Sequence, residues 1–229
     1  MARHHSEQEI FDFIVGDFTC AWNALAELPD CSAGHRGNFV FALQAAILLE
    51  WSCRLCSSDP NALRDFSIEL NKIESKYFTQ LDDAVKPANF GFPGIGPDPL
   101  KNLLSALWDL IRNGNAHEYQ DSIVTLTDGK KLALGLQGVK HRWPLAMVAS
   151  NRSSLDHLSY RFDRDGDLIV IVHPGALFLD ICEAIRQANL LARGLRIKHM
   201  TRPDRSGSSY QFDLSQLERA LQNGGLLKL

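Results

Sequence analysis

The first half of the chain repeats apolar residues with the spacing of an α-helix. Ser6 with Glu9 forms a capping box, and Asp59–Pro60 and Asp98–Pro99 each combine an N-cap with proline at the first helical position. The pattern predicts four helices, over residues 7–28, 37–56, 60–81 and 99–111. Long helices with short connections predict an up-and-down four-helix bundle.

After Asp121 the apolar spacing shortens to that of β-strands. Asp128–Gly129 lies between two apolar runs and the acidic turn 163–167 between two more, so each predicts a hairpin. The four predicted strands are 123–126, 132–136, 157–162 and 168–172, and residues 143–149 are a candidate fifth. Further helices are predicted over residues 174–193 and 215–223.

These elements predict a mainly α, α+β protein. A four-helix bundle over residues 1–120 is followed, over residues 121–229, by a small antiparallel β-sheet and C-terminal helices. The connection at 119–122 is too short for a free linker, so we expect the second part to pack on the bundle. A single continuous domain is the alternative division of the chain.

Composition and charge narrow the class of protein. The chain has 229 residues, 45% of them hydrophobic and 22% charged, which is ordinary for a globular protein. The formal net charge is -3, so an RNA site would need a local basic patch. The N-terminus lacks a secretory pattern, and the apolar run 39–49 is too short for a bilayer. We expect a cytoplasmic protein with no membrane partner.

The cysteines form no disulfide framework or zinc pattern. Their odd number and scatter argue against a secreted framework, and the Cys53–Cys56 CxxC has no second pair to complete a zinc site. We interpret all five as free thiols and expect no metal or other cofactor; they are Cys20, Cys31, Cys53, Cys56 and Cys182.

The side chains most suited to chemistry follow the fourth helix, where its apolar face ends. That face consists of Leu100, Leu103, Leu104, Leu107 and Ile111. Arg112 is a permanent cation with a planar fork of donors, and His117 exchanges a proton near neutral pH. On an unbroken helix the two would point about 140° apart.

Arg112 and His117 could still converge in two ways. Gly114 could break the helix, or two copies of the chain could pack this segment about a two-fold axis. The alternative is a helix C-terminus at which Gly114 and Asn115 cap the chain and Arg112 favours the helix dipole.

The segment Arg112–His117 (RNGNAH) has an arginine, four residues and a histidine, with a polar residue directly after the arginine. It resembles the signature of the HEPN superfamily of all-helical domains. Gly37–Leu43 (GNFVFAL), followed by Glu50, is similar to the helix before an RNG-x-x-H segment in bacterial HEPN-type proteins. The resemblance covers residues 37–119. It implies a HEPN-like bundle that dimerises through the motif helices.

Two functions follow from the resemblance. A dimeric binding or scaffold protein without catalysis would join Arg112, Asn113 and Glu118 in a polar network between helices. The carboxylate of Glu118 and the net negative charge favour this function. The alternative is a toxin-like, metal-independent endoribonuclease in which His117 transfers protons and Arg112 stabilises phosphate charge. Residues in substrate-binding or supporting roles would be Asn113, Asn115, Glu118, Tyr119 and Glu50.

The resemblance also implies partners. A second copy of the chain would complete the motif in either function, and RNA would be the ligand of the ribonuclease. In a defence or toxin–antitoxin setting, the partner would be an antitoxin such as a small nucleotidyltransferase.

Overall fold

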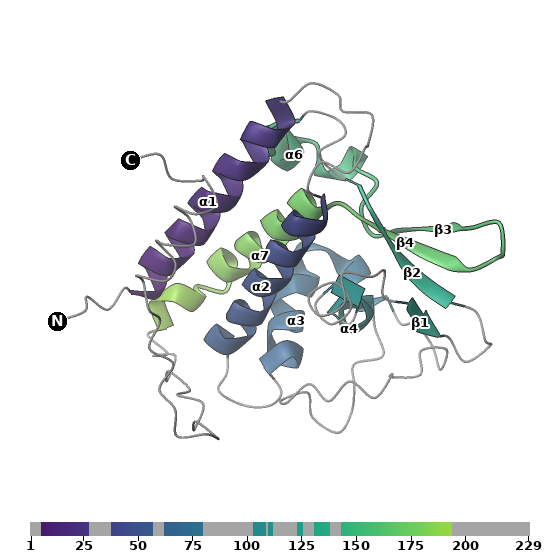
Figure 1. Cartoon of the computed structure of the whole chain (residues 1–229). Helices are drawn as coiled ribbons and strands as arrows, with labels where there is room; N and C mark the ends of the chain where they lie inside the picture. Colours follow the sequence, from purple (N-terminus) through teal and green to yellow (C-terminus); the bar gives the residue numbers. More distant parts are fainter. Residues whose placement is uncertain are drawn as a thin grey trace, which may run out of the picture. The chain divides into compact units, whose positions relative to one another are not determined.

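The computed structural model describes residues 6–27, 38–56, 62–79, 103–108, 110–111, 123–125, 131–137 and 143–193. The chain divides into two units, Met1–Arg196 and Ile197–Leu229, and every described residue belongs to the first. Within the described part, helices predominate and one small sheet is present (Figure 1). This confirms the predicted mainly helical α+β class. The turn at Asp128–Gly129 and the predicted helix 215–223 lie outside the described residues.

The first two helices end within one residue of their predicted limits. Helix α1 (Glu7–Glu27) begins with the predicted capping box: the Ser6 N–H donates to Glu9 Oε2 at 2.9 Å, and the Glu9 N–H donates to Ser6 Oγ at 3.2 Å. Helix α2 (Asn38–Cys56) is apolar nearly all round. It alone among the described helices has the length and composition to cross a membrane, and 50% of its apolar window is buried inside the protein, as in a core helix.

The third helix ends earlier than predicted. Helix α3 covers Ala62–Ile73, and a 3₁₀ turn, η1 (Ser75–Phe78), replaces the rest of the predicted helix. Glu74 lies between them with an extended backbone (φ -144°), and its carboxylate accepts the Lys76 N–H at 3.0 Å. This local bond competes with the helix and starts the new turn.

The apolar face predicted before Arg112 is buried. Helix α4 covers Leu103–Leu107, and Trp108, Leu110 and Ile111 after it are π-helical. Within the described part of that face, every side chain is between 0% and 2% exposed: Leu103, Leu104, Leu107 and Ile111.

The strand pairs of both predicted hairpins are present, but the sheet is mixed. Strands β1 (Ile123–Thr125) and β2 (Lys131–Leu136) are antiparallel, as are β3 (Ser159–Phe162) and β4 (Leu168–Val172). The strand order is β1-β2-β4-β3, and β2 runs parallel to β4. The prediction of a wholly antiparallel sheet was therefore wrong. Strand β4 is apolar at every position, which is typical of a strand covered on both faces.

The crossover between β2 and β4 contains a helix where a fifth strand was predicted. Helix α6 (Leu145–Ser150) follows Pro144, whose φ of -54° suits a helix start. Leu145 and Val148, one turn apart, are both buried. The Leu145 N–H donates to Asn23 Oδ1 at 2.9 Å, which ties α6 to α1. The helical spacing of the two buried residues therefore decided the structure of this segment.

The helix that follows the sheet lies among the N-terminal helices. Helix α7 (Pro174–Gln187) packs against α2, α3 and α6 (Figure 1). Phe178 stacks on Phe18 of α1 with ring centroids 3.6 Å apart. The predicted helix to residue 193 is interrupted, because Asn189 adopts a left-handed backbone (φ 52°) before the 3₁₀ turn η6 (Leu190–Arg193).

Candidate functional site

The motif residues predicted from the sequence lie outside the described residues: Arg112, Asn113, Asn115, His117, Glu118 and Tyr119. The last described residue before this segment is Ile111, which is 2% exposed. The backbone directly before Arg112 is therefore anchored in the core by its apolar side chain.

Glu50, the remaining predicted residue, lies in the second half of α2. Its carboxylate accepts a bond from Arg54 at 2.5 Å, one helical turn further on, and its side chain is 21% exposed. The two residues thus form an i,i+4 pair at the surface of the helix.

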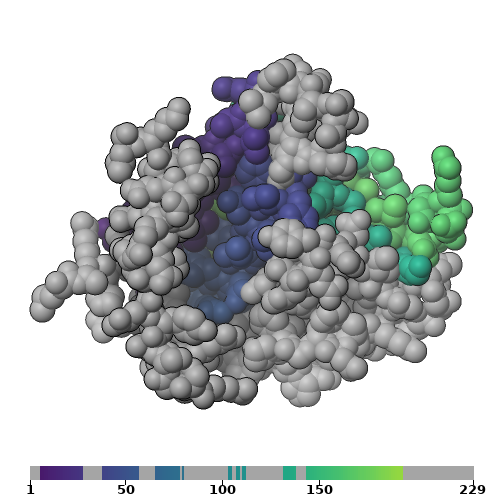
Figure 2. Space-filling model, viewed as in Figure 1, coloured from purple at the N-terminus to yellow at the C-terminus, as the bar shows by residue number. Residues whose placement is uncertain are grey.

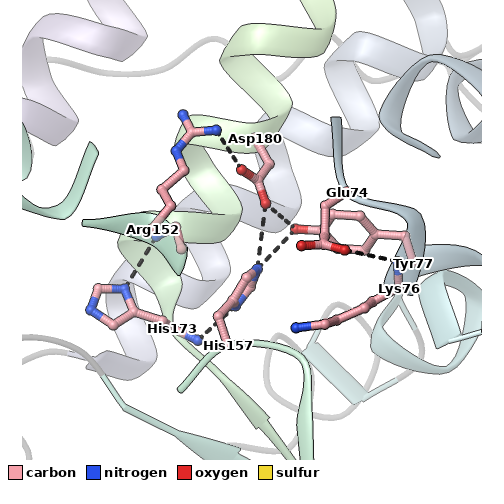
Figure 3. A network of polar contacts seen from close by, with 8 residues as sticks. Glu74, Lys76, Tyr77, Arg152, His157, His173 and Asp180 are labelled. Carbon is pink, nitrogen blue, oxygen red and sulfur yellow. Dashed lines mark hydrogen bonds and ion pairs between the residues drawn. The ribbon is translucent and has the colours of Figure 1, made fainter. Parts of the chain in front are cut away.

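A second group of ionisable side chains meets inside the described part of the chain. Tyr77 comes from η1, Arg152 from the 3₁₀ turn η5 (Arg152–Ser154), His157 from the segment before β3, and Asp180 from the middle of α7. Figure 3 shows the four side chains converging between these elements. We call them the Tyr77–Asp180 network.

Asp180 is the centre of this network. Its Oδ1 accepts from Nη1 of Arg152 at 2.7 Å, and its Oδ2 accepts from the Tyr77 hydroxyl at 3.0 Å. Nε2 of His157 lies 3.1 Å from the Tyr77 hydroxyl oxygen and 3.5 Å from Asp180 Oδ2 (Figure 3). One buried carboxylate therefore holds three elements that are distant in the sequence.

The bonds also fix where the protons lie. The backbone N–H of His173 donates to Nδ1 of His157 at 3.1 Å, so a neutral imidazole carries its proton on Nε2. That Nε2–H donates to the Tyr77 oxygen, and the Tyr77 hydroxyl in turn donates to Asp180. Each donor in this chain of bonds has one acceptor, and the direction runs from His157 to Asp180.

Burial controls the chemistry of the network. Tyr77 is 0% exposed, Asp180 3% and His157 8%, whereas the side chain of Arg152 is 32% exposed. Burial raises the pKa of Tyr77 well above its ordinary value of 10.0, and the negative charge of Asp180 raises it further. Tyr77 therefore stays a neutral hydroxyl and a hydrogen-bond donor at physiological pH.

The backbone on either side of β3 and β4 positions the two histidines. Leu158 has a left-handed backbone (φ 53°), unusual for a branched side chain, and its N–H donates to the Ile171 carbonyl at 2.8 Å. This conformation turns the chain between His157 and β3. His173 is the N-cap of α7, where its Nδ1 accepts the Ala176 N–H at 3.2 Å.

The network combines the groups used in proton transfer, but its geometry is that of a structural clamp. The Tyr77 oxygen donates one bond and accepts one, and both carboxylate oxygens of Asp180 accept a bond. Only Arg152 reaches the surface appreciably. A substrate would therefore have to displace internal bonds before it could meet these groups.

The sequence contains one signal for this network. Asp180 is a carboxylate inside the apolar run of α7, on the face that also carries Leu177, Ile181 and Ala184. A charged residue at such a position is almost never fully buried without a partner. The partners themselves, Tyr77 and His157, are not recognisable because their sequence positions show only an inward-facing aromatic and a residue at a strand start.

Two of the described thiols, Cys53 on α2 and Cys182 on α7, are buried in the core, whereas Cys20 is exposed. Burial raises the pKa of Cys53 far above its ordinary value of 9.0, and burial raises the pKa of Cys182 to about 12. Both stay protonated and apolar at physiological pH. Within the described residues, no group of three or more His, Cys, Asp or Glu side chains could hold a metal ion.

Comparisons of the chain with family models, with curated proteins and with solved structures find no match.

Proposed function

We propose that the chain is a HEPN-like dimeric binding or scaffold module without catalysis, built on a four-helix up-and-down bundle. Its motif residues, Arg112 with Asn113 and Glu118, would form a polar network between the helices of two copies. The ligand classes that fit such a module are nucleic acid and a toxin–antitoxin or defence partner. Cytoplasmic location belongs to the same proposal.

The observation that carries the proposal is the anchoring of the helix before Arg112. The apolar side chains of Leu104, Leu107 and Ile111 are at most 2% exposed, so this face is used within the chain. The polar segment that follows it starts from a fixed point. A fixed starting point is what an interface network needs, since its polar groups must meet partners at defined distances.

The Tyr77–Asp180 network gives a second, weaker support. The chain already uses a buried carboxylate to join an arginine and a neutral hydroxyl across elements. Arg112 and Glu118 would make the same kind of bond between two copies. Such a pair fixes the register of an interface more than it adds to affinity.

The second candidate function is a metal-independent endoribonuclease that uses Arg112 and His117. The sequence motif supports it, because an arginine fork suits a phosphate and a histidine transfers protons near neutral pH. The two functions differ in what happens to RNA, so one set of variants distinguishes them.

The deciding experiment incubates purified protein with single-stranded RNA in the presence of a chelator, and measures dimer dissociation by sedimentation. The scaffold function predicts no cleavage, and Arg112→Ala weakens the dimer because Glu118 loses its partner. The ribonuclease function predicts products with 2′,3′-cyclic phosphate ends, abolished by His117→Ala and by Arg112→Ala, and not restored by Arg112→Lys.

Lys72→Ala is the matched control. It removes a cation from an exposed helical pair with Glu69, and it should change neither RNA cleavage nor dimerisation. Cleavage that persists in His117→Ala would exclude this segment from the mechanism. A dimer unchanged by Arg112→Ala, together with intact RNA, would refute the scaffold function as proposed.

A further inference from the structure

Strand β3 is an edge strand whose outer side is accessible. It ends the strand order β1-β2-β4-β3 of the described sheet and pairs with β4 on its inner side. Its residues are well exposed, with Phe162 at 72% and Tyr160 at 37%. In the space-filling view the β3–β4 hairpin (green) lies at the right-hand margin, open to view (Figure 2). An exposed edge of this kind is a template for another strand.

The register of the hairpin shows which backbone groups point outward. The Asp163 N–H bonds to the Asp167 carbonyl at 3.0 Å, so Asp163 is a hydrogen-bonded position of the β3–β4 pair. Because these positions alternate along an antiparallel pair, Ser159 and Arg161 also point their backbone groups inward. The N–H and C=O groups of Tyr160 and Phe162 therefore point to the outer side.

The outer side is complementary to itself. If two copies pair antiparallel with Phe162 opposite Phe162, Arg161 of each copy lies opposite Asp163 of the other. Shifting the strands by two residues would instead place the two Arg161 side chains opposite each other. Charge thus favours the register centred on Phe162 over the register centred on Arg161.

The charged groups retain capacity for such a contact. Both turn bonds to Asp163, from the N–H groups of Asp165 and Asp167, go to Oδ1, so neither uses Oδ2. Arg161 bonds to Asp156 through one of its terminal nitrogens, and its fork has further donors. The hairpin can therefore keep its own bonds while it pairs.

We propose that two copies of this chain associate through β3, antiparallel and centred on Phe162, to form a sheet continuous across the two-fold axis. The proposal does not depend on residues 112–119 and goes beyond the proposed function. Pairing over about three residues a side, 161–163, buries much less than about 1,000 Å², so the association is weak, with a dissociation constant above roughly 1 μM.

Cysteine cross-linking tests the register. In a background with Cys20, Cys31 and Cys56 replaced by Ser, Phe162→Cys places two thiols opposite each other. In a hydrogen-bonded pair the Cα atoms are about 5.5 Å apart, within the range of a disulfide. The control is Asp165→Cys at the exposed tip of the same hairpin, which does not meet its counterpart in this register. Under a mild oxidant at high protein concentration, Phe162→Cys should form covalent dimer about ten times faster than Asp165→Cys. Equal rates would overturn the proposal.

Proline substitution tests the backbone bonds. Phe162→Pro removes an N–H that β4 does not use, so the hairpin can form while pairing between copies is blocked. Phe162→Ala is the matched variant, since it loses the same ring and keeps the N–H. In sedimentation, Phe162→Pro should not associate through β3 at concentrations where Phe162→Ala still forms dimers. Association equal in the two variants would contradict backbone pairing. If Phe162→Pro fails to fold, the cross-linking rates alone decide.

Arg112→Ala separates this surface from the motif. A dimer that resists Arg112→Ala and is lost in Phe162→Pro supports β3 pairing and counts against the motif interface. The opposite result refutes β3 pairing and leaves the proposed function standing.

Discussion

Asp180 is the buried carboxylate at the centre of the Tyr77–Asp180 network. Its two oxygens hold Arg152 and Tyr77, and it is 3% exposed. Replacing it with asparagine removes the charge that Arg152 neutralises and puts an amide donor where one acceptor oxygen was. A buried partner of Asp180 therefore loses the oxygen that accepts its hydrogen bond.

We therefore expect Asp180→Asn to lower the free energy of unfolding by about 2–4 kcal/mol. Chemical denaturation monitored by tryptophan fluorescence measures it. The control is Lys72→Gln, which breaks an i,i+3 pair with Glu69 whose lysine side chain is 58% exposed, and which should cost less than about 1 kcal/mol. Equal effects of the two substitutions would mean that the network adds no stability.

The buried thiol of Cys182 predicts a loss of stability in alkali. Its pKa is raised by burial from 9.0 to about 12 in the folded chain, so the unfolded chain loses this proton first as the pH rises. The contribution of the protonated thiol to the free energy of unfolding is complete below pH 9.0, and it is lost between pH 9.0 and about 12. The raised pKa values of Cys53 and Tyr77 act in the same direction.

Cys182→Ala should therefore make the pH dependence shallower, although its cavity lowers stability at neutral pH. Between pH 9 and 10.5, the free energy of unfolding of the unaltered chain should fall more steeply, by up to about 1.4 kcal/mol per pH unit for this one group. Urea titrations under reducing conditions at several pH values give the two slopes. Parallel slopes would show that the thiol does not titrate differently in the two states.

Alanine substitution at two glycines should change the stability of the chain in opposite directions. At Gly135 in β2, an added Cβ would lie 2.6 Å from Ile171 Cδ1 and 3.0 Å from Ile169 Cγ2, on the neighbouring strand. At Gly16 in α1, nothing lies within 4 Å of the added atom. The packing of β2 against β4 therefore determines the effect of alanine at Gly135. Helix propensity alone determines its effect at Gly16.

Gly135→Ala should destabilise the chain by about 1–2 kcal/mol, and Gly16→Ala should stabilise it by about 0.5–1 kcal/mol. Ile171→Val removes the methyl group that the new Cβ would meet, so the double variant with Gly135→Ala should lose less than the sum of the single losses. Thermal unfolding of the unaltered chain and of these four variants measures the effects. Strict additivity would show that the Ile171 methyl group does not limit the space at Gly135.

The sequence predicts each element well where local signals agree. The Ser6–Glu9 capping box forms as predicted, and α1 and α2 have their predicted limits within one residue. The strand pairs of both predicted hairpins also form. Caps and apolar spacing act over a few residues, so the sequence shows them directly. The parallel pairing of β2 with β4 was missed, since no local signal distinguishes two hairpins side by side from one antiparallel sheet. In residues 143–149, the apolar spacing fits either a short strand or a short helix, and Pro144 favours the start of a helix.

The candidate site also has a part that the sequence predicts and a part that only the fold reveals. The buried face before Arg112 follows from helical spacing, and its burial is confirmed. The Tyr77–Asp180 network unites residues 77, 152, 157 and 180, and only the fold brings them together. A carboxylate on the apolar face of a helix indicates that it has buried partners, but the identity of those partners depends on tertiary packing.

For the whole molecule, the two proposed surfaces have a joint consequence. Each is isologous, with the same patch on both copies, and a chain that carries two such surfaces can close into a tetramer or extend into a fibre. We expect species larger than a dimer at high concentration. Phe162→Pro and Arg112→Ala should each limit assembly to dimers, and the double variant should be monomeric. Light scattering across a concentration series measures this, and a double variant that still dimerises would require a third surface.

The parallel pairing of β2 with β4 also affects the protein while it is being made. Leu132 pairs with Leu168, which leaves the ribosome 36 residues later. At 5–20 residues per second, the edge of β2 waits roughly 2–7 s for its neighbour. During that interval the nascent chain presents one unpaired edge of β2, a strand that contains Leu132, Leu134 and Leu136 and begins with the charged Lys131. Synthesis, more than the finished fold, is the stage at which this sheet is open to pairing with the wrong chain.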